Sequence, residues 1–169
     1  MKYISLFLLI TLSACATANN CDVGAKYASQ GMIARALSEW GKHTYDETTK
    51  ELARTTIECL KVSGLATDDH AAVKWLESAA AQAIPAAEAQ LGIIYYNGIG
   101  VKQSKEKGVA LLKSAADHGD VSAKVTLAII MAYGDKEFRN LKTAEKLLTD
   151  AAKSGSTTAL KALEKIKAR

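Results

Sequence analysis

The stretch AEAQLGIIYYNGIGVKQSKEKGVALLKSAADHGD, residues 87–120, decides the fold because its pattern recurs along the chain. A shift of 36 residues places Pro85–Asp120 on Val121–Ser156 without a gap. The matching positions carry small or aliphatic residues in both copies: Ala87, Leu91, Leu111, Leu112, Ala115, Ala116 and Gly119 fall on Ala123, Leu127, Leu147, Leu148, Ala151, Ala152 and Gly155. Self-similarity at a fixed period of this length indicates a stacked array of repeats.

The same step reveals incomplete copies on both sides. Upstream, a degenerate third copy places Ala53, Ile57, Gly64, Ala72, Trp75, Leu76, Ala79 and Ala80 on Ala89, Ile93, Gly100, Gly108, Leu111, Leu112, Ala115 and Ala116. Downstream, Ala159 and Leu163 match Ala123 and Leu127. This last half-copy predicts a helix that caps the array.

Each unit is predicted to contain two helices. Pro85 suits a first helical position, and apolar residues recur at three- and four-residue spacing up to Gly98–Gly100. Ser104 is then expected to cap a second helix that ends near Gly119, and Asp68 and Asn140 are its equivalents in the neighbouring units. The small residues at positions 92, 108, 115 and 116 favour close helix contacts.

The composition agrees with one helical domain. The chain has 169 residues, of which 49% are hydrophobic, 6% are aromatic and one is proline, and thirty are alanine, the strongest helix former. This length excludes a large multidomain enzyme. The net charge of +4 is too small an excess to indicate nucleic-acid binding.

The repeated motif resembles the Sel-1-like repeat, a relative of the tetratricopeptide repeat. The resemblance rests on Leu91-Gly92-x-x-Tyr95, on Gly98-x-Gly100-Val101 and on the Ala115-Ala116 pair. It implies an all-α fold, a right-handed α-solenoid of antiparallel helix pairs over residues 51–169, with residues 21–50 as an N-terminal helical cap. Those N-terminal residues follow a helical pattern through Ala28, Met32, Ala36 and Trp40. Two departures fall in the flanking copies, where Lys136-Glu137 replaces Gly-Val and Thr55-Thr56 replaces Leu-Gly.

Residues 1–14 have the pattern of a secretory signal, with Lys2 followed by a short apolar run. The sequence Leu12-Ser13-Ala14-Cys15 resembles the bacterial lipobox, which implies cleavage before Cys15 and lipidation of its thiol and amine. Residues 15–20 would be the lipidated Cys and a short tether, and Ala16, which is not Asp, implies the outer membrane, facing the periplasm. The alternative is an ordinary signal with a chance cysteine.

Cys21 and Cys59 remain after lipidation of Cys15. An even pair in an oxidising compartment favours a disulfide, which would close a loop of 38 residues. A metal site is the weaker alternative, because neither cysteine has a neighbouring ligand at zinc-site spacing.

The sequence shows no pattern that indicates catalysis. It contains no GxSxG, HExxH or Walker motif, and His43, His70 and His118 share no ligand spacing. The glycines around Ile99 follow a predicted helix rather than a strand, so a dinucleotide-binding loop is not expected. We therefore expect a protein without enzymatic activity, cofactor or metal.

The resemblance implies a concave groove lined by the first helix of each unit. With Leu91 and Tyr95 assigned to the core, the expected partner-binding residues are Ile57, Lys61, Ile93, Tyr96, Asn97, Ile129, Ala132, Tyr133, Lys161 and Lys165. Apolar and aromatic residues with a charged rim are typical of protein interfaces. The alternative is that these residues pack against neighbouring helices.

The first hypothesis is a non-enzymatic periplasmic lipoprotein that binds a protein partner, membrane-bound through its N-terminal lipid. A sharper form is an immunity protein, since Sel-1-like lipoproteins resemble those that neutralise secreted antibacterial effectors, including phospholipases. The alternatives are a peptidoglycan-binding or envelope-modifying protein and a structural accessory of an envelope assembly.

Overall fold

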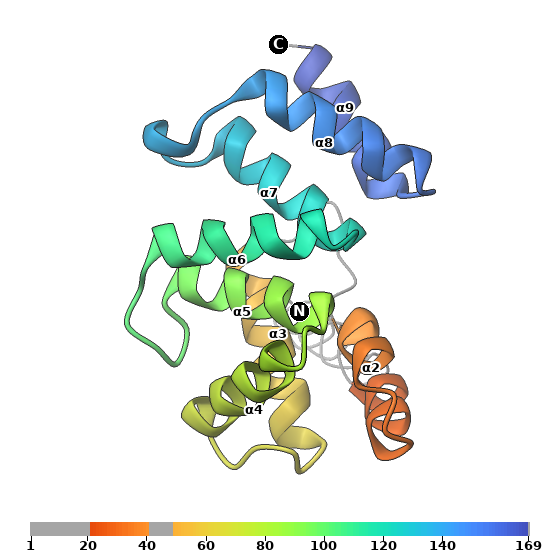
Figure 1. Ribbon diagram of the computed structural model, residues 1–169, viewed down its shortest axis with the longest axis vertical. Coiled ribbons are helices and arrows are strands. Elements are labelled where there is room, and N and C mark those ends of the chain that lie inside the picture. The colour runs from red at the N-terminus through yellow and green to blue at the C-terminus, as the bar shows by residue number, and fades with distance from the viewer. Residues whose placement is uncertain (1–20, 41–48, 169) are drawn as a thin grey trace, which may run out of the picture.

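A computed structural model of the chain describes residues 21–40 and 49–168 (Figure 1). In these two ranges all regular structure is helical. A helical stretch at residues 21–29 precedes α2 (Ile33–Trp40), α3 (Thr49–Val62), α4 (Asp69–Ala81), α5 (Pro85–Asn97), α6 (Lys105–Asp117), α7 (Val121–Tyr133), the 3₁₀ helix η1 (Lys136–Phe138), α8 (Leu141–Lys153) and α9 (Thr157–Lys167). The signal, Cys15 and His43 lie outside the described residues.

From α3 onward the helices form antiparallel pairs that stack along the long axis of the molecule (Figure 1). Each helix packs against the next, and the first helices of neighbouring pairs also pack together: α3 on α5, α5 on α7 and α7 on α9. These first helices form an inner layer, and α4, α6 and α8 form an outer one. The predicted all-α solenoid is confirmed.

The predicted helix caps are present in every unit. Asp68, Ser104 and Asn140 each accept a backbone N–H three residues further on, at 2.7, 3.3 and 3.0 Å. Such caps each stabilise a helix by about 1 kcal/mol. Pro85 is the first residue of α5, and Gly98 ends that helix in the left-handed conformation with φ of 68°.

The 36-residue period also describes the core. Leu76, Leu112 and Leu148 occupy one position of the second helix in successive units, and each is 0% exposed. Between α5 and α6, Gly92 and Gly108 bring the backbones so close that a Cβ on Gly108 would lie 2.7 Å from the carbonyl oxygen of Gly92. The predicted role of these small residues is therefore confirmed.

The N-terminal cap differs from the predicted continuous helix. Gly31, with φ of 73°, breaks it into the stretch at residues 21–29 and α2. Met32, expected on the apolar stripe, is 39% exposed. The side chains of Ala36, Leu37 and Trp40 are buried, because α2 packs against α3 and α5. Residues 41–48 of the predicted cap lie outside the described residues.

Cys21 and Cys59 form the predicted disulfide, with their Cα atoms 4.9 Å apart. The bond ties the start of the described chain to α3. Beside it, the indole N–H of Trp40 donates to the carbonyl oxygen of Cys21 at 3.2 Å, and the Trp40 ring lies 6.4 Å from that of Trp75. The disulfide and this aromatic pair therefore hold the N-terminal cap on the array.

Candidate interaction surface

The inner face of the array closes toward the N-terminus and opens toward the C-terminus. Ile57, Ile93, Ile129 and Lys165 occupy one repeat position on α3, α5, α7 and α9. Ile57 and Ile93 are only 1% and 0% exposed, Ile129 is partly exposed and Lys165 is exposed. At this repeat position, the inner face is accessible only on α7 and α9.

Helix α2 packs on α3 and α5, beside the buried part of the inner face. Leu37 of α2 is fully buried, and with Ser38 it faces a cavity of about 250 Å³ whose other walls come from α5 and from the turn between α6 and α7. Those walls are Ala86, Ala89, Gln90, Gly119, Asp120, Val121 and Ser122. The cavity therefore marks the seam between the N-terminal cap and the repeats.

The polar groups in this seam have structural partners. Gln90 accepts a hydrogen bond from the Thr56 hydroxyl at 2.8 Å, which joins α5 to α3 in the core. Asp120 caps α7 by accepting the N–H of Ala123 at 2.7 Å. Burial raises the pKa of the Asp120 carboxyl above its ordinary value, against the effect of these backbone hydrogen bonds. The seam holds the fold together and presents no assembled reactive group.

The prediction that Ile57, Ile93 and Ala132 face a groove is wrong. The first two are buried among packed helices, because α3 packs on α5 and α2 packs on both. Ala132 is 4% exposed, and the 36-residue step makes it the equivalent of Tyr96 rather than of Asn97. Tyr96 itself points away from the inner face, toward the following unit.

Tyr96 belongs to a cluster that joins two units at their loops. Its hydroxyl donates to Asp135 at 3.1 Å, and Lys105 forms an ion pair with the same carboxylate at 2.8 Å. The Phe138 ring meets the Tyr96 ring edge-on, with centroids 6.3 Å apart. Lys105 and then Tyr96 hold the pKa of Asp135 below its ordinary value, whereas burial and then the Asp135 hydrogen bond raise that of Tyr96.

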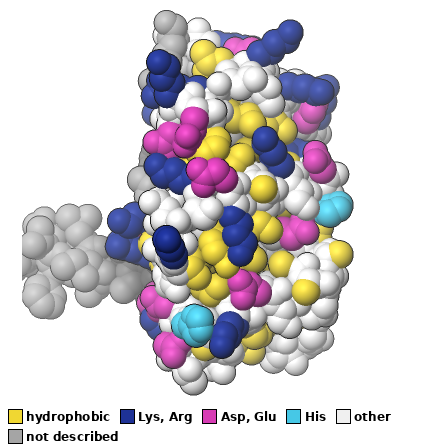
Figure 2. All heavy atoms as spheres, turned by 60° about the vertical axis from the view of Figure 1, so that its left-hand side comes forward, with side chains coloured by type: hydrophobic (Ala, Val, Ile, Leu, Met, Phe, Trp, Pro, Cys, Tyr) yellow, Lys and Arg dark blue, Asp and Glu magenta, His cyan; other side chains and the backbone are white. Residues whose placement is uncertain are grey.

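The prediction that Tyr96 lines the groove is therefore corrected, and the cluster itself was not expected. A signal for it was present in the sequence, because Lys136-Glu137 departs from the repeat's Gly-Val. Those two residues and Phe138 form η1, and the Phe138 ring lies beside that of Tyr96. Figure 2 shows hydrophobic side chains gathered between Lys and Asp or Glu on the face that includes these loops.

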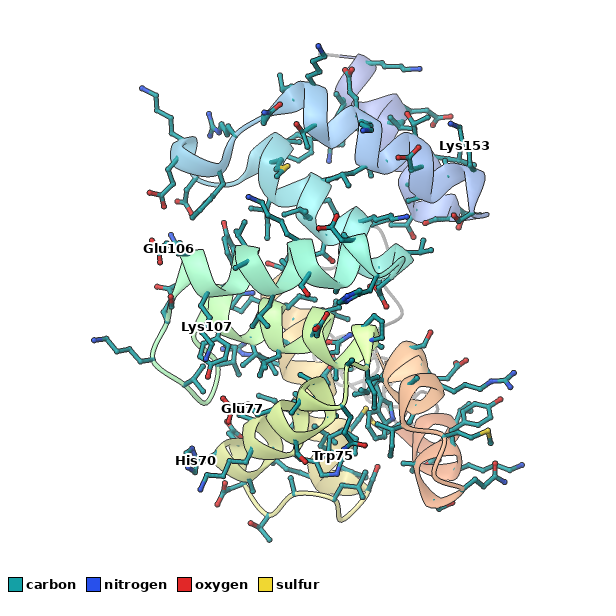
Figure 3. All side chains as sticks on the ribbon, in the orientation of Figure 1. His70, Trp75, Glu77, Glu106, Lys107 and Lys153 are labelled. Carbon is teal, nitrogen blue, oxygen red and sulfur yellow. A yellow bond between two sulfur atoms is a disulfide. The ribbon has the colours of Figure 1, made fainter. Side chains whose placement is uncertain are left out.

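Tyr95, expected in the core, is partly exposed on the outer side of the array. Its hydroxyl donates to Glu77 of α4 at 2.7 Å, and the Lys107 ammonium lies 3.6 Å from the centroid of its ring. Figure 3 shows Glu77 and Lys107 approaching from the neighbouring helices α4 and α6. Tyr95 therefore links two units across their surface.

Asn97 and Lys61 also contribute to contacts within the array. Asn97 donates to the carbonyl oxygen of Ile93 at 2.8 Å and to the Thr49 hydroxyl at 3.3 Å. Lys61 pairs with Glu58 at 2.8 Å and with Asp69 at 3.0 Å. Hydrogen bonds to these carboxylates, that of Glu58 foremost, raise the pKa of Lys61 above its ordinary value.

A family model for the Sel1 repeat matches residues 62–83, 85–120 and 125–156, which together make up more than half of the chain. The chain belongs to the Sel1 repeat family. The crystal structure of a Sel1 repeat protein from Oxalobacter formigenes superposes with a TM-score of 0.59 and 24% sequence identity, over 94% of this chain and 66% of that one. That likeness shows the fold. No curated protein gives a significant match to the chain.

Sel1 repeat proteins are typically non-catalytic adaptors, and membership of this family suggests protein–protein interaction. Within the described residues, no group of three or more His, Cys, Asp or Glu side chains is placed to hold a metal ion. Among the same residues, no helix has the length and apolar character needed to span a bilayer.

At the repeat position of Ile129 and Lys165, the Sel1 inner face is accessible only on α7 and α9. We call these two residues, together with Tyr133 on α7 and Lys161 on α9, the open inner face. The side chains of Ile129 and Tyr133 are partly exposed, and those of Lys161 and Lys165 are exposed. Because α7 and α9 pack directly together, the surface has an apolar strip beside a basic one. These four residues remain the predicted partner-binding set.

Proposed function

We propose that this Sel1 repeat chain is a lipoprotein that binds one protein partner through the open inner face. The observation that carries the proposal is the change in exposure from Ile57 and Ile93 to Ile129 at one repeat position. This position is buried in the first two units and partly exposed in the third. A partner that binds at this position would therefore contact α7 and α9.

The residues of the open inner face define the partner's chemistry. Ile129 and Tyr133 supply apolar and aromatic area for the centre of an interface, and Lys161 and Lys165 supply a basic border. The complementary partner surface has an apolar patch edged by carboxylates. Opposite charges at the border would speed association and orient the partner.

The location is proposed from the sequence alone, as the outer membrane facing the periplasm. Leu12-Ser13-Ala14-Cys15 supports lipidation of Cys15. The tether formed by residues 16–20 extends at most about 3.5 Å per residue, which would keep the domain close to the bilayer. Two or three acyl chains on one residue give stable anchoring.

The proposed biological role is immunity against a secreted antibacterial effector, such as a phospholipase, delivered to the periplasm. An inhibitor anchored in the membrane would stand beside the lipid that such a toxin attacks. Neutralisation would require affinity for the toxin and occlusion of its active site, and this is within the capacity of a binding surface without catalytic groups.

The lipid anchor is tested by replacing Cys15 with Ser in the full chain. We expect Cys15→Ser to abolish palmitate labelling and to move the protein from the membrane fraction. The replacement removes the only thiol that the lipobox would modify. Labelling that persists in the variant would refute lipidation at this residue.

The binding surface is tested by affinity capture with the tagged full chain, from an envelope extract combined with the secreted proteins of competing strains. We expect one partner to be captured. Its binding should weaken at least about thirtyfold in the Ile129→Glu variant and also in the double variant Lys161→Glu/Lys165→Glu, as expected for hot-spot residues. The matched control is Ala110→Glu, which adds a charge to the exposed outer face of α6.

A partner lost only with the inner-face variants supports the proposal, and a phospholipase or another toxin as that partner supports immunity. A partner that binds all variants equally would contradict the open inner face as the site. Capture of cell-wall fragments would instead favour peptidoglycan binding.

A further inference from the structure

The positive charge of the described chain is concentrated in its last two helices. Residues 139–168 contain seven Lys or Arg and three Asp or Glu, whereas residues 21–40 and 49–138 contain twelve Lys or Arg and thirteen Asp or Glu. The last part therefore has a formal charge of +4 and the remainder −1. The basic residues are Arg139, Lys142, Lys146, Lys153, Lys161, Lys165 and Lys167.

Three of these lysines form a stripe along the outer face of α8. At 100° per residue, Lys142, Lys146 and Lys153 point directly away from the buried Ala144, Leu148 and Ala151. We call these three lysines the α8 stripe. All three are exposed, and Figure 3 shows Lys153 at the C-terminal end of α8.

Two carboxylates of α8, those of Glu145 and Asp150, flank the stripe, and only that of Asp150 pairs with a stripe lysine. Lys153 lies 3.7 Å from Asp150, in a pair whose lysine side chain is 75% exposed. Lys142 and Lys146 form no ion pair with any residue that the structure describes. The only other residue in line with them on this face is Thr149, which is uncharged.

The repeat fold does not require these charges. The 36-residue step identifies the same four outer positions in the other units, and all of them are exposed. On α4 they are His70, Lys74, Glu77 and Ala81, and on α6 they are Glu106, Ala110, Lys113 and Asp117. Because the equivalent faces carry mixed charges, the lysines on α8 serve something other than the packing of the solenoid.

We propose that the α8 stripe binds the anionic phosphate headgroups of a bilayer surface. The stripe lies on the outer face of α8 and has no aromatic or large aliphatic residue in line with it, whereas protein interfaces depend on such anchors. On the apolar side of α8, Leu148 is buried, and Leu141, which is 53% exposed, lies at the start of the helix about 120° around from the stripe. The contact is therefore superficial and electrostatic. Clustered lysines bind anionic lipid in this way, and each contributes about fivefold to the partition coefficient.

The contact would orient the molecule. The helical stretch at residues 21–29 and α8 lie toward opposite ends of the long axis (Figure 1). The short tether proposed above would keep the lipid anchor near residues 21–29, so lipid contact there and at the α8 stripe would lay the solenoid along the bilayer. Because α8 belongs to the outer layer, the open inner face would turn toward the aqueous compartment. This orientation rests on the proposed function, but headgroup binding by the stripe does not.

The test measures co-sedimentation of the full chain carrying Cys15→Ser with phosphatidylcholine vesicles, with or without about one third phosphatidylglycerol. We expect phosphatidylglycerol to strengthen binding over that to phosphatidylcholine alone, and Lys142→Gln/Lys146→Gln/Lys153→Gln to remove this increase, which should be on the order of a hundredfold in the partition coefficient. Salt at about 1 M should abolish the difference by screening. Binding through the apolar residues 3–12 would be common to all variants and to both kinds of vesicle.

The matched control, Lys26→Gln/Lys74→Gln/Lys113→Gln, removes the same number of charges from other exposed positions. Preserved helical circular dichroism and thermal unfolding verify that both variants fold. An equal loss in both variants, no loss in the stripe variant, or binding that does not depend on phosphatidylglycerol would each overturn the proposal. Since this assay contains neither acylated protein nor a protein partner, its failure leaves the proposed function untouched.

Discussion

Replacing Gly108 with Ala is expected to destabilise the protein by about 2 kcal/mol, although helix propensity alone would stabilise it by up to about 1 kcal/mol. The added methyl would lie 2.7 Å from both the carbonyl oxygen of Gly92 and the backbone nitrogen of Tyr96. Both atoms belong to the backbone of α5, so α5 and α6 would have to separate. A loss of stability would show that Gly108 is needed for the close packing of α5 on α6. A gain would show that helix propensity alone decides at this position.

The measurement is the free energy of unfolding from urea denaturation. Ala110→Val serves as the control, because it adds bulk to the same helix at an exposed position and should cost less than about 1 kcal/mol. If Gly108→Ala proved as stable as the parent or more so, the close approach of α5 and α6 would be wrong.

Removing the disulfide is expected to have the largest effect on stability. On the chain-entropy model, opening the loop of 38 residues between Cys21 and Cys59 costs about 4 kcal/mol. The loss should be seen with Cys21→Ser/Cys59→Ser and equally when the parent protein is unfolded in a thiol reductant. Urea unfolding followed by tryptophan fluorescence is suitable, because Trp40 is 1% exposed beside the bond.

The reductant provides the control for this prediction. It should have no effect on the double serine variant, whose midpoint should match that of the reduced parent. Before reduction, the two cysteines of the parent should be inaccessible to alkylation. Free alkylation of both, or equal stability with and without reductant, would contradict a structural disulfide.

Features that depend on local chemistry could be predicted from the sequence. The side chains of Ser104 and its equivalents accept the otherwise unpaired N–H groups at the start of a helix, and proline is favoured at the first position of a helix, as at Pro85. These helix starts could therefore be predicted without knowledge of the tertiary structure. The 36-residue period supplied the stacking, because a solenoid repeats its contacts from unit to unit. Gly92 and Gly108 followed from the same repeat pattern.

Features that break the repeat could not be predicted in this way. The burial of Ile93 accompanies the packing of α2, which has no copy elsewhere in the array. The role of Tyr96 depends on Asp135 and Phe138, about one repeat away and in a loop that departs from the family pattern. Gly31 ended the first helix although the apolar spacing continued across it. For Ile93 and Tyr96, contacts between distant segments outweighed the local pattern, whereas at Gly31 the left-handed backbone of a glycine did so.

The central claim, that a protein partner binds the open inner face, is tested most directly by a photo-crosslinking residue placed at Ile129 of the full chain in living cells. A second chain with the same residue at Ala110, on the outer face of α6, is the comparison. We expect one specific crosslinked partner from position 129 and none from position 110. Crosslinks to that partner from position 110 alone would contradict the claim, as would the absence of any protein crosslink from position 129 in cells exposed to the secreted proteins of competing strains.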